Sequence, residues 1–175
     1  VQKRPDAMDI KLGSATVIKY THPKVLRNDT AWGIPIEYQA QQPACGAHAG
    51  AVLKDLALGA RFTPQATWGD LKTFDGWLIN DGTDIRSVMK SITKSGVLDF
   101  AQLGNNVDLS LLDYAIAPTP AQRSLMAKNS GQGYGFITDL SLDGLKQFIT
   151  DHGPTIILIR VSSRFWSNAQ GVSSW

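Results

Sequence analysis

Cys45 is the only cysteine in the 175-residue sequence, and it stands at the start of a segment with helical periodicity. Gln39 lies six residues earlier. A thiol attacks as the thiolate, and the unpaired N–H groups at a helix N-terminus favour that anion. A side-chain amide just before the helix is suited to join the cysteine N–H in binding an oxyanion. The spacing therefore predicts a thiol nucleophile, Cys45, with Gln39 as its oxyanion donor.

The helix that would position this thiol has a clear apolar pattern. Its expected buried face consists of Cys45, Ala49, Val52 and Leu56, with Leu53 added to the same stripe. Gly59 follows the pattern and is expected to end the helix. A lone cysteine is also commonly a small buried hydrophobic residue. The position at the helix start and the spacing to Gln39 favour the nucleophile.

Residues 39–49 resemble the active-site signature of papain-like cysteine peptidases, especially the bacterial and phage-type branch. The resemblance implies that Cys45 is the nucleophile and Gln39 the oxyanion residue. Ala40 and Pro43 depart from it, because the family usually has glycine at both positions. In a second register Cys45 matches a structural cysteine and His48 takes the place of the nucleophile, which would describe an inactive relative.

Residues 80–90 are similar to the second landmark of the family, an Asn/Asp-Gly turn that leads into a helix. In the family this turn lends backbone groups to the peptide substrate. The resemblance therefore implies that Asp81 and Gly82 are substrate-binding residues. An ordinary turn glycine is the alternative for Gly82.

The residues after this turn predict a helix on their own spacing. The expected apolar stripe is Ile85, Val88, Met89 and Ile92. Asp81 or Thr83 is expected to cap its start, and Gly96 to end it.

A papain-like mechanism needs an imidazole that takes the thiol proton and later protonates the leaving amine. The sequence has three histidines, His22, His48 and His152. We expect His22 in a loop, His48 as a structural neighbour of Cys45 on one helix, and His152 at a helix end. None matches the family's catalytic histidine, which we expect outside this chain.

Three later segments also carry local signals. Thr119 and Pro120 predict a short helix through about Ala127. Residues 131–135 are glycine-rich, lack the lysine and Ser/Thr of a phosphate loop, and are expected to be a flexible connection. Residues 141–149 predict a capped helix stopped by Gly153 and Pro154, and residues 155–161 predict a strand.

This order of helix, Gly-Pro and strand resembles the beginning of the family's β-rich lobe. The resemblance implies an α+β, papain-like two-lobe fold of which this chain supplies the helical lobe and an incomplete β-rich lobe. We expect a leader or propeptide remnant at residues 1–24, the helical lobe with the catalytic cysteine at 25–140, and the truncated start of the β-rich lobe at 141–175. The chain would be a shortened one or half of a cleaved two-chain enzyme.

Composition limits the other function classes. With 17 basic and 15 acidic side chains the net charge is +2, which gives no reason to expect nucleic acid or a membrane as partner. One cysteine and three scattered histidines do not supply a structural zinc site, and no metal or cofactor is expected. The compartment stays open, with a secreted or phage-associated setting favoured over a membrane.

The expected function is an endopeptidase that hydrolyses peptide bonds in a peptide or protein substrate, with a possible second chain that carries the histidine. Two alternatives stay open. One is a catalytically inactive peptide-binding module, and the other is a thiol acyltransferase or amidase on the same fold.

Overall fold

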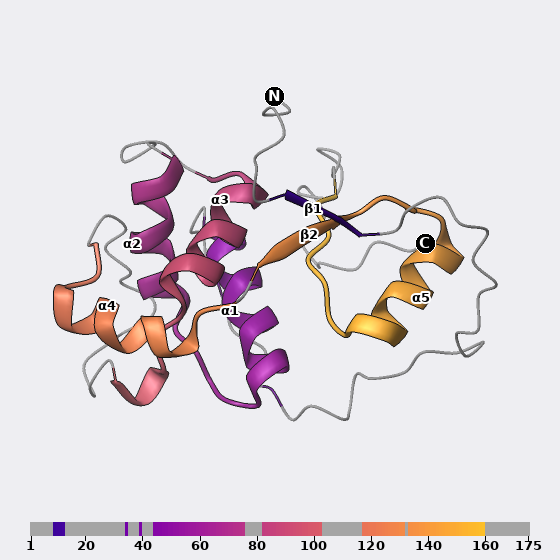
Figure 1. Ribbon diagram of the computed structural model, residues 1–175. Helices are drawn as coiled ribbons and strands as arrows, with labels where there is room; N and C mark the ends of the chain where they lie inside the picture. The colour runs from indigo at the N-terminus through magenta and orange to yellow at the C-terminus, as the bar shows by residue number, and fades with distance from the viewer. Residues whose placement is uncertain are drawn as a thin grey trace, which may run out of the picture.

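The computed structural model describes residues 9–12, 34, 39, 44–75, 82–102, 117–131 and 133–159. Over these ranges the chain is mainly helical, with one small parallel sheet (Figure 1). The elements in chain order are β1 (Asp9–Leu12), α1 (Cys45–Leu58), α2 (Pro64–Asp75), α3 (Ile85–Lys90), the π-helical turn η1 (Ser91–Ser95), the 3₁₀ turn η2 (Phe100–Gln102), α4 (Pro120–Met126), the 3₁₀ turn η4 (Ala127–Asn129), β2 (Tyr134–Ile137) and α5 (Leu142–His152).

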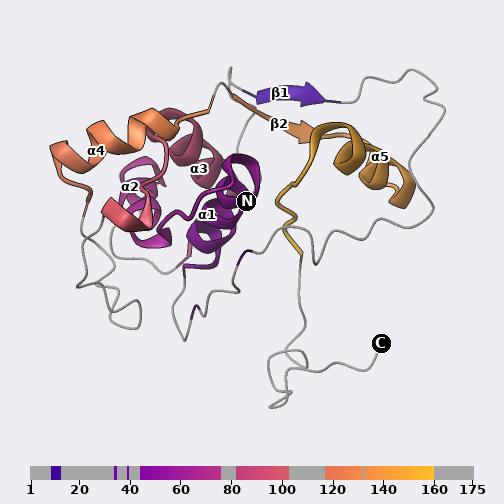
Figure 2. The same cartoon turned by 90° about the horizontal axis from the view of Figure 1, so that it is seen from below.

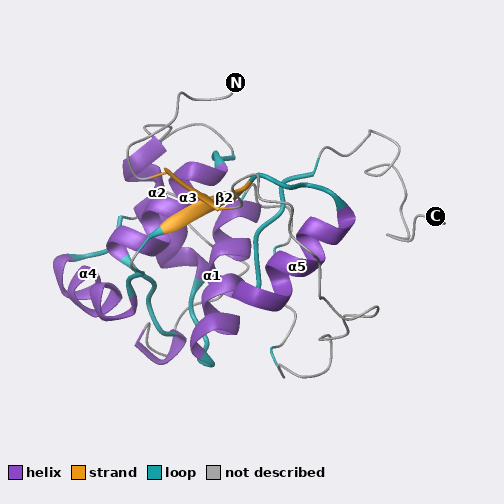
Figure 3. Ribbon diagram, turned by 45° about the vertical axis from the view of Figure 1, so that its right-hand side comes forward, coloured by secondary structure: helices purple, strands orange, loops and turns teal. Residues whose placement is uncertain are grey.

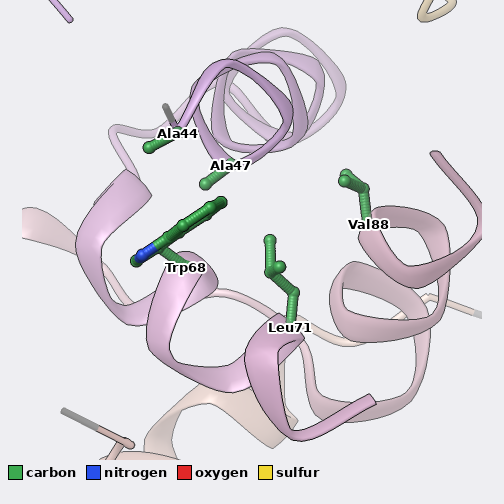
Figure 4. Packing of buried hydrophobic residues seen from close by; sticks show 5 residues of the cluster. All are labelled: Ala44, Ala47, Trp68, Leu71 and Val88. Atoms are coloured by element: carbon green, nitrogen blue, oxygen red, sulfur yellow. The ribbon is translucent and has the colours of Figure 1, made fainter. Parts of the chain in front are cut away.

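The core lies where α1, α2 and α3 pack against one another. Its central cluster consists of Ala44, Ala47, Trp68, Leu71 and Val88. In Figure 4, Trp68 and Leu71 extend from α2 toward the small side chains of α1 and toward Val88 of α3. The alanines of α1 leave the volume that the large indole fills, so the two helices can approach closely.

The bounds predicted for α1 are confirmed. It begins at Cys45, and Gly59 ends it in the left-handed region at φ 65°. The predicted buried face is wrong for Cys45, which is exposed, and Ala49, Val52, Leu53 and Leu56 are only partly buried. Of these, Leu53 packs against a core cluster of Phe62, Ile92 and Val97. The residues that α1 buries are Ala47, His48, Gly50, Ala51, Lys54 and Asp55.

Two of these buried residues are charged, and distant partners account for their burial. The Lys54 ammonium donates to the Asn129 carbonyl at 3.0 Å. The Asp55 carboxylate accepts from the Phe62 N–H at 2.8 Å. Buried polar groups are tolerated when they are hydrogen-bonded, so this face can turn inward despite its charges.

The helix α2 is not among the elements expected from the sequence, although Thr63 and Pro64 carry a start signal. The Thr63 hydroxyl accepts from the Gln65 N–H at 3.2 Å. Midway along α2, the fully buried Asp70 carboxylate forms an ion pair with Arg123 of α4 and accepts from the Ser91 hydroxyl at 2.8 Å. One carboxylate therefore joins α2, η1 and α4.

The helix after residue 82 begins with a different cap from the one expected. Asp84, rather than Asp81 or Thr83, is the N-cap, and its carboxylate accepts from the Ser87 N–H at 3.0 Å. The predicted apolar stripe is confirmed for Val88 and Ile92, which are buried. Gly96 ends the helix as predicted, at φ 83°.

The sheet joins two distant parts of the chain. The strands β1 and β2 are parallel, with Asp9 opposite Tyr134 and Leu12 opposite Ile137. A strand thus lies within residues 1–24, the expected leader or propeptide remnant. Residues 131–135 are not only a connection, because β2 begins at Tyr134 (orange in Figure 3).

The two later helices are confirmed. Thr119 and Gln122 form a capping box at the start of α4. Ser141 caps α5 by accepting from the Gly144 N–H at 3.0 Å, and Gly153 ends that helix at φ 87°.

The strand predicted over residues 155–161 is not formed over 155–159, and residues 160–161 lie outside the described residues. Ile156 instead packs against the central core cluster. A strand requires a hydrogen-bonding neighbour as well as a β-prone sequence, and residues 155–159 have no strand neighbour in the described part of the chain.

Candidate functional site

Cys45 is the first residue of α1, and its side chain is exposed as a free thiol. The N-cap, Ala44, offers no side-chain hydrogen bond, and the first turn contains no acidic residue. The N–H groups of this turn therefore donate to no capping side chain of Ala44 and to no carboxylate within the turn. Such a terminus favours an anion close to it, such as the oxyanion that forms when a thiol attacks a carbonyl group.

The turn at Gly82 lies directly beside this helix start. A Cβ atom added to Gly46 would stand 2.7 Å from the Thr83 methyl group and 2.8 Å from a Val88 methyl group. The missing side chain at Gly46, next to Cys45, is what lets this turn approach α1. The structure thus brings the predicted nucleophile and the predicted substrate-binding Gly82 into one region.

Gly82 itself has the backbone of a turn glycine. Its φ is 82°, and a Cβ atom built there would meet no described residue within 4 Å. Its carbonyl accepts a hydrogen bond from the ammonium of Lys72. Asp81, the other expected substrate-binding residue, lies outside the described residues, and Gln39 is described and half-buried.

Lys72 and Trp68 are residues of this region that the sequence did not point to. The Lys72 side chain is buried, and its Nζ atom stands 4.2 Å from the centroid of the Trp68 ring. Trp68 in turn belongs to the cluster that holds Ala44 and Ala47, on either side of Cys45. The spacing of four residues on α2 places Lys72 and Trp68 on one face. This spacing becomes informative only when the helix α2 has itself been predicted.

The described histidines differ in burial. His48 is buried on α1, while Cys45 on the preceding turn is exposed. His152 is the exposed last residue of α5, as predicted, and its ring lies 4.8 Å from that of Phe148. His22 lies outside the described residues.

Burial of Lys54 in α1 lowers its pKa from the usual 10.5. Between the lowered value and 10.5, the unfolded chain binds this proton more tightly than the folded chain. The free energy of unfolding contributed by Lys54 therefore rises as the pH increases through this window. We expect Lys54→Met to remove that rise, as measured by urea unfolding at a series of alkaline pH values.

The exposed Lys128 supplies the matched control for this titration. Lys128→Met is expected to keep the pH dependence of the unmodified chain. Parallel stability curves for Lys54→Met and the unmodified chain would contradict the effect of burial on Lys54.

Over the described ranges, no three histidine, cysteine or carboxylate side chains gather to hold a metal ion. Within the same part of the chain, no helix has the length and apolar character required to cross a bilayer. No family model, curated protein or solved structure matches the chain.

Proposed function

We propose that this chain is the nucleophile-bearing part of a papain-like cysteine endopeptidase, with Cys45 as the nucleophile. The observation that carries the proposal is the exposed thiol of Cys45 at the first position of α1, with the Gly82 turn packed beside it through Gly46. A thiol at a helix start can attack a carbonyl, and an adjacent turn can align an extended peptide for that attack.

The chemistry follows from these groups. The Cys45 sulfur attacks the carbonyl carbon of the scissile bond, and the π electrons move onto the carbonyl oxygen. The N–H of Cys45 and the side-chain amide of Gln39 bind this oxyanion. An imidazolium gives its proton to the leaving nitrogen as the C–N bond breaks, and water then hydrolyses the thioester.

We place the imidazole outside these 175 residues. His48 follows Cys45 by only three residues on one helix, a short link that hinders an in-line approach to the same thiol. His152 belongs to α5, whose sequence resembles the segment before the family's β-rich lobe. A second chain or a further segment of the same protein would supply the ring.

The two-lobe fold is part of the same proposal. Figure 2 shows α1 to α4 gathered on one side, with β1, β2 and α5 on the other. Ile156, which follows α5, packs against the cluster that contains Ala44. The segment after α5 thus returns to the start of α1, where a second lobe would complete the site.

The reactivity of the thiol tests this proposal. We expect iodoacetamide at about pH 6 to alkylate folded Cys45 on the order of ten times faster than the same residue in urea-unfolded chain. Because Cys45 is the only thiol, the unfolded chain is an internal reference. Mass mapping of the adduct gives both rates. Equal rates, or slower alkylation of the folded chain, would favour an inert cysteine and a binding module.

A further inference from the structure

Lys72 carries a charged group into the interior of the protein, with only 2% of its surface exposed. Lysine is almost never buried to this extent unless its charge is paired. In the described structure the ammonium donates to the carbonyl of Gly82 and lies over the ring of Trp68. A carbonyl dipole and an aromatic face are both suited to a cation, and both lower the penalty of burying it.

These contacts of Lys72 lie on either side of the start of α1. On one side, Trp68 packs with Ala44 and Ala47, which precede and follow Cys45 (Figure 4). On the other side, Gly82 is followed by Thr83, whose methyl group fills the space next to Gly46. Lys72 therefore connects the core beneath Cys45 with the turn beside it.

The hydrogen bond from Lys72 restrains the position of the Gly82 turn. Gly82 has no side chain of its own, and none of the described residues comes within 4 Å of the place a Cβ atom would take. A hydrogen bond from a charged donor is shorter and roughly twice as strong as one between neutral groups. The Lys72 ammonium is thus a strong restraint on the Gly82 carbonyl, and through it on the peptide plane that follows.

We infer that Lys72 is a positioning residue, which fixes the Gly82 turn so that a peptide is aligned against Cys45. The inference rests on the proposed function. Lys72 does not touch the substrate in this account, and it acts only through the turn. A displacement of about 1 Å in a positioning element can cost on the order of a hundredfold in rate.

The test compares two kinds of reagent that alkylate a thiol through the same iodoacetyl group. The rate with iodoacetamide reports the reactivity of the thiol alone. The rate with N-iodoacetyl dipeptide amides, which carry an apolar, an acidic or a basic residue, reports that reactivity together with the alignment of a peptide. The carbon–iodine bond breaks as the sulfur–carbon bond forms and iodide leaves, so no general acid is needed. In the full 175-residue chain, the dipeptide rate divided by the iodoacetamide rate reports how well a peptide is aligned against Cys45.

We expect the dipeptide that reacts fastest with the unmodified chain to lose about ten- to a hundredfold in rate in Lys72→Met, while the iodoacetamide rate stays within about twofold. Lys54→Met is the matched control, because Lys54 is also a buried lysine that donates to a distant backbone carbonyl. It should leave the ratio unchanged. Lys72→Arg keeps a cationic donor and should recover most of the ratio. If Lys72→Met does not fold, Lys72→Gln, which keeps only a neutral donor, gives the loss instead.

The outcomes separate the two proposals. An unchanged ratio in a folded variant that lacks the cation, or an equal loss with both reagents, overturns the assignment of Lys72 and leaves the nucleophile in place. Folded, unmodified chain that reacts no faster than its unfolded form with either reagent overturns the proposed function and this assignment with it.

Discussion

Cys45→Ala is expected to abolish acylation of the chain by activated esters and to lower peptide hydrolysis, measured with the proposed histidine-bearing part present, at least about a thousandfold. The reason is that, in the proposed mechanism, the sulfur of Cys45 forms the covalent intermediate, and the substitution removes it. Cys45 is exposed, so the free energy of unfolding should change by no more than about 0.5 kcal/mol. Initial rates of ester and peptide cleavage, together with a urea unfolding curve, measure both effects.

Cys45→Ser is the matched variant, because it keeps the size of the side chain and replaces only the sulfur. A serine hydroxyl is a much weaker nucleophile than a thiol near neutral pH, so serine at this position should be almost as inactive as alanine. Hydrolysis that persists in both variants, at more than about a tenth of the original rate, would show that another group is the nucleophile.

Gly96→Ala is expected to cause the largest loss of stability, at least about 4 kcal/mol, and to prevent folding if the chain is only marginally stable. A Cβ atom at this position would stand 1.9 Å from the carbonyl oxygen of Met126 and 2.9 Å from the nitrogen of Ser130. Both are backbone atoms, which cannot move aside as a flexible side chain would. The φ of 83° adds strain for any residue with a Cβ atom.

Gly59→Ala isolates the backbone-strain part of this effect, and the difference between the two variants gives the steric part. Gly59 also has a positive φ, 65°, but a Cβ atom there would meet nothing within 4 Å. Its substitution should therefore cost only about 1 kcal/mol, from backbone strain alone. Urea unfolding of both variants gives the difference. If Gly96→Ala were no less stable than Gly59→Ala, the close approach of residues 126–130 to Gly96 would be wrong.

The bounds of helices were predictable here because their signals are local. Gly59 and Gly96 are suited to the left-handed backbone that ends a helix, and Thr119 and Ser141 cap through hydrogen bonds within a few residues. Each of these signals is complete within one turn of the chain, so no knowledge of the tertiary structure is needed.

The buried faces were not predictable because they depend on distant partners. Apolar periodicity pointed to Val52 and Leu56, whereas the structure buries Lys54, whose ammonium reaches the carbonyl of Asn129. The helix α2 shows the same effect, because Asp70 and Lys72 are buried charges that interrupt an apolar pattern. The partner of Asp70, Arg123, is 53 residues away in the sequence.

The candidate site also has parts that follow from the local sequence and parts that depend on the tertiary structure. Cys45 at the helix start and Gly82 in a turn follow from residue type and spacing, and the structure places the Gly82 turn beside the helix start. The contact that joins them depends on Gly46 having no side chain, and the support from Lys72 depends on the packing of α2. Neither is visible until the helices are in place.

The most direct test of the account is to look for the covalent intermediate on the sulfur. An N-acyl amino acid p-nitrophenyl ester needs no protonated leaving group, so Cys45 should be acylated even without the histidine. We expect the intact mass of the chain to rise by one acyl group, peptide mapping to place it on Cys45, and neutral hydroxylamine to remove it as expected for a thioester. A chain that acquires no acyl group, or acquires it on a lysine or serine while Cys45 stays free, would contradict the central claim.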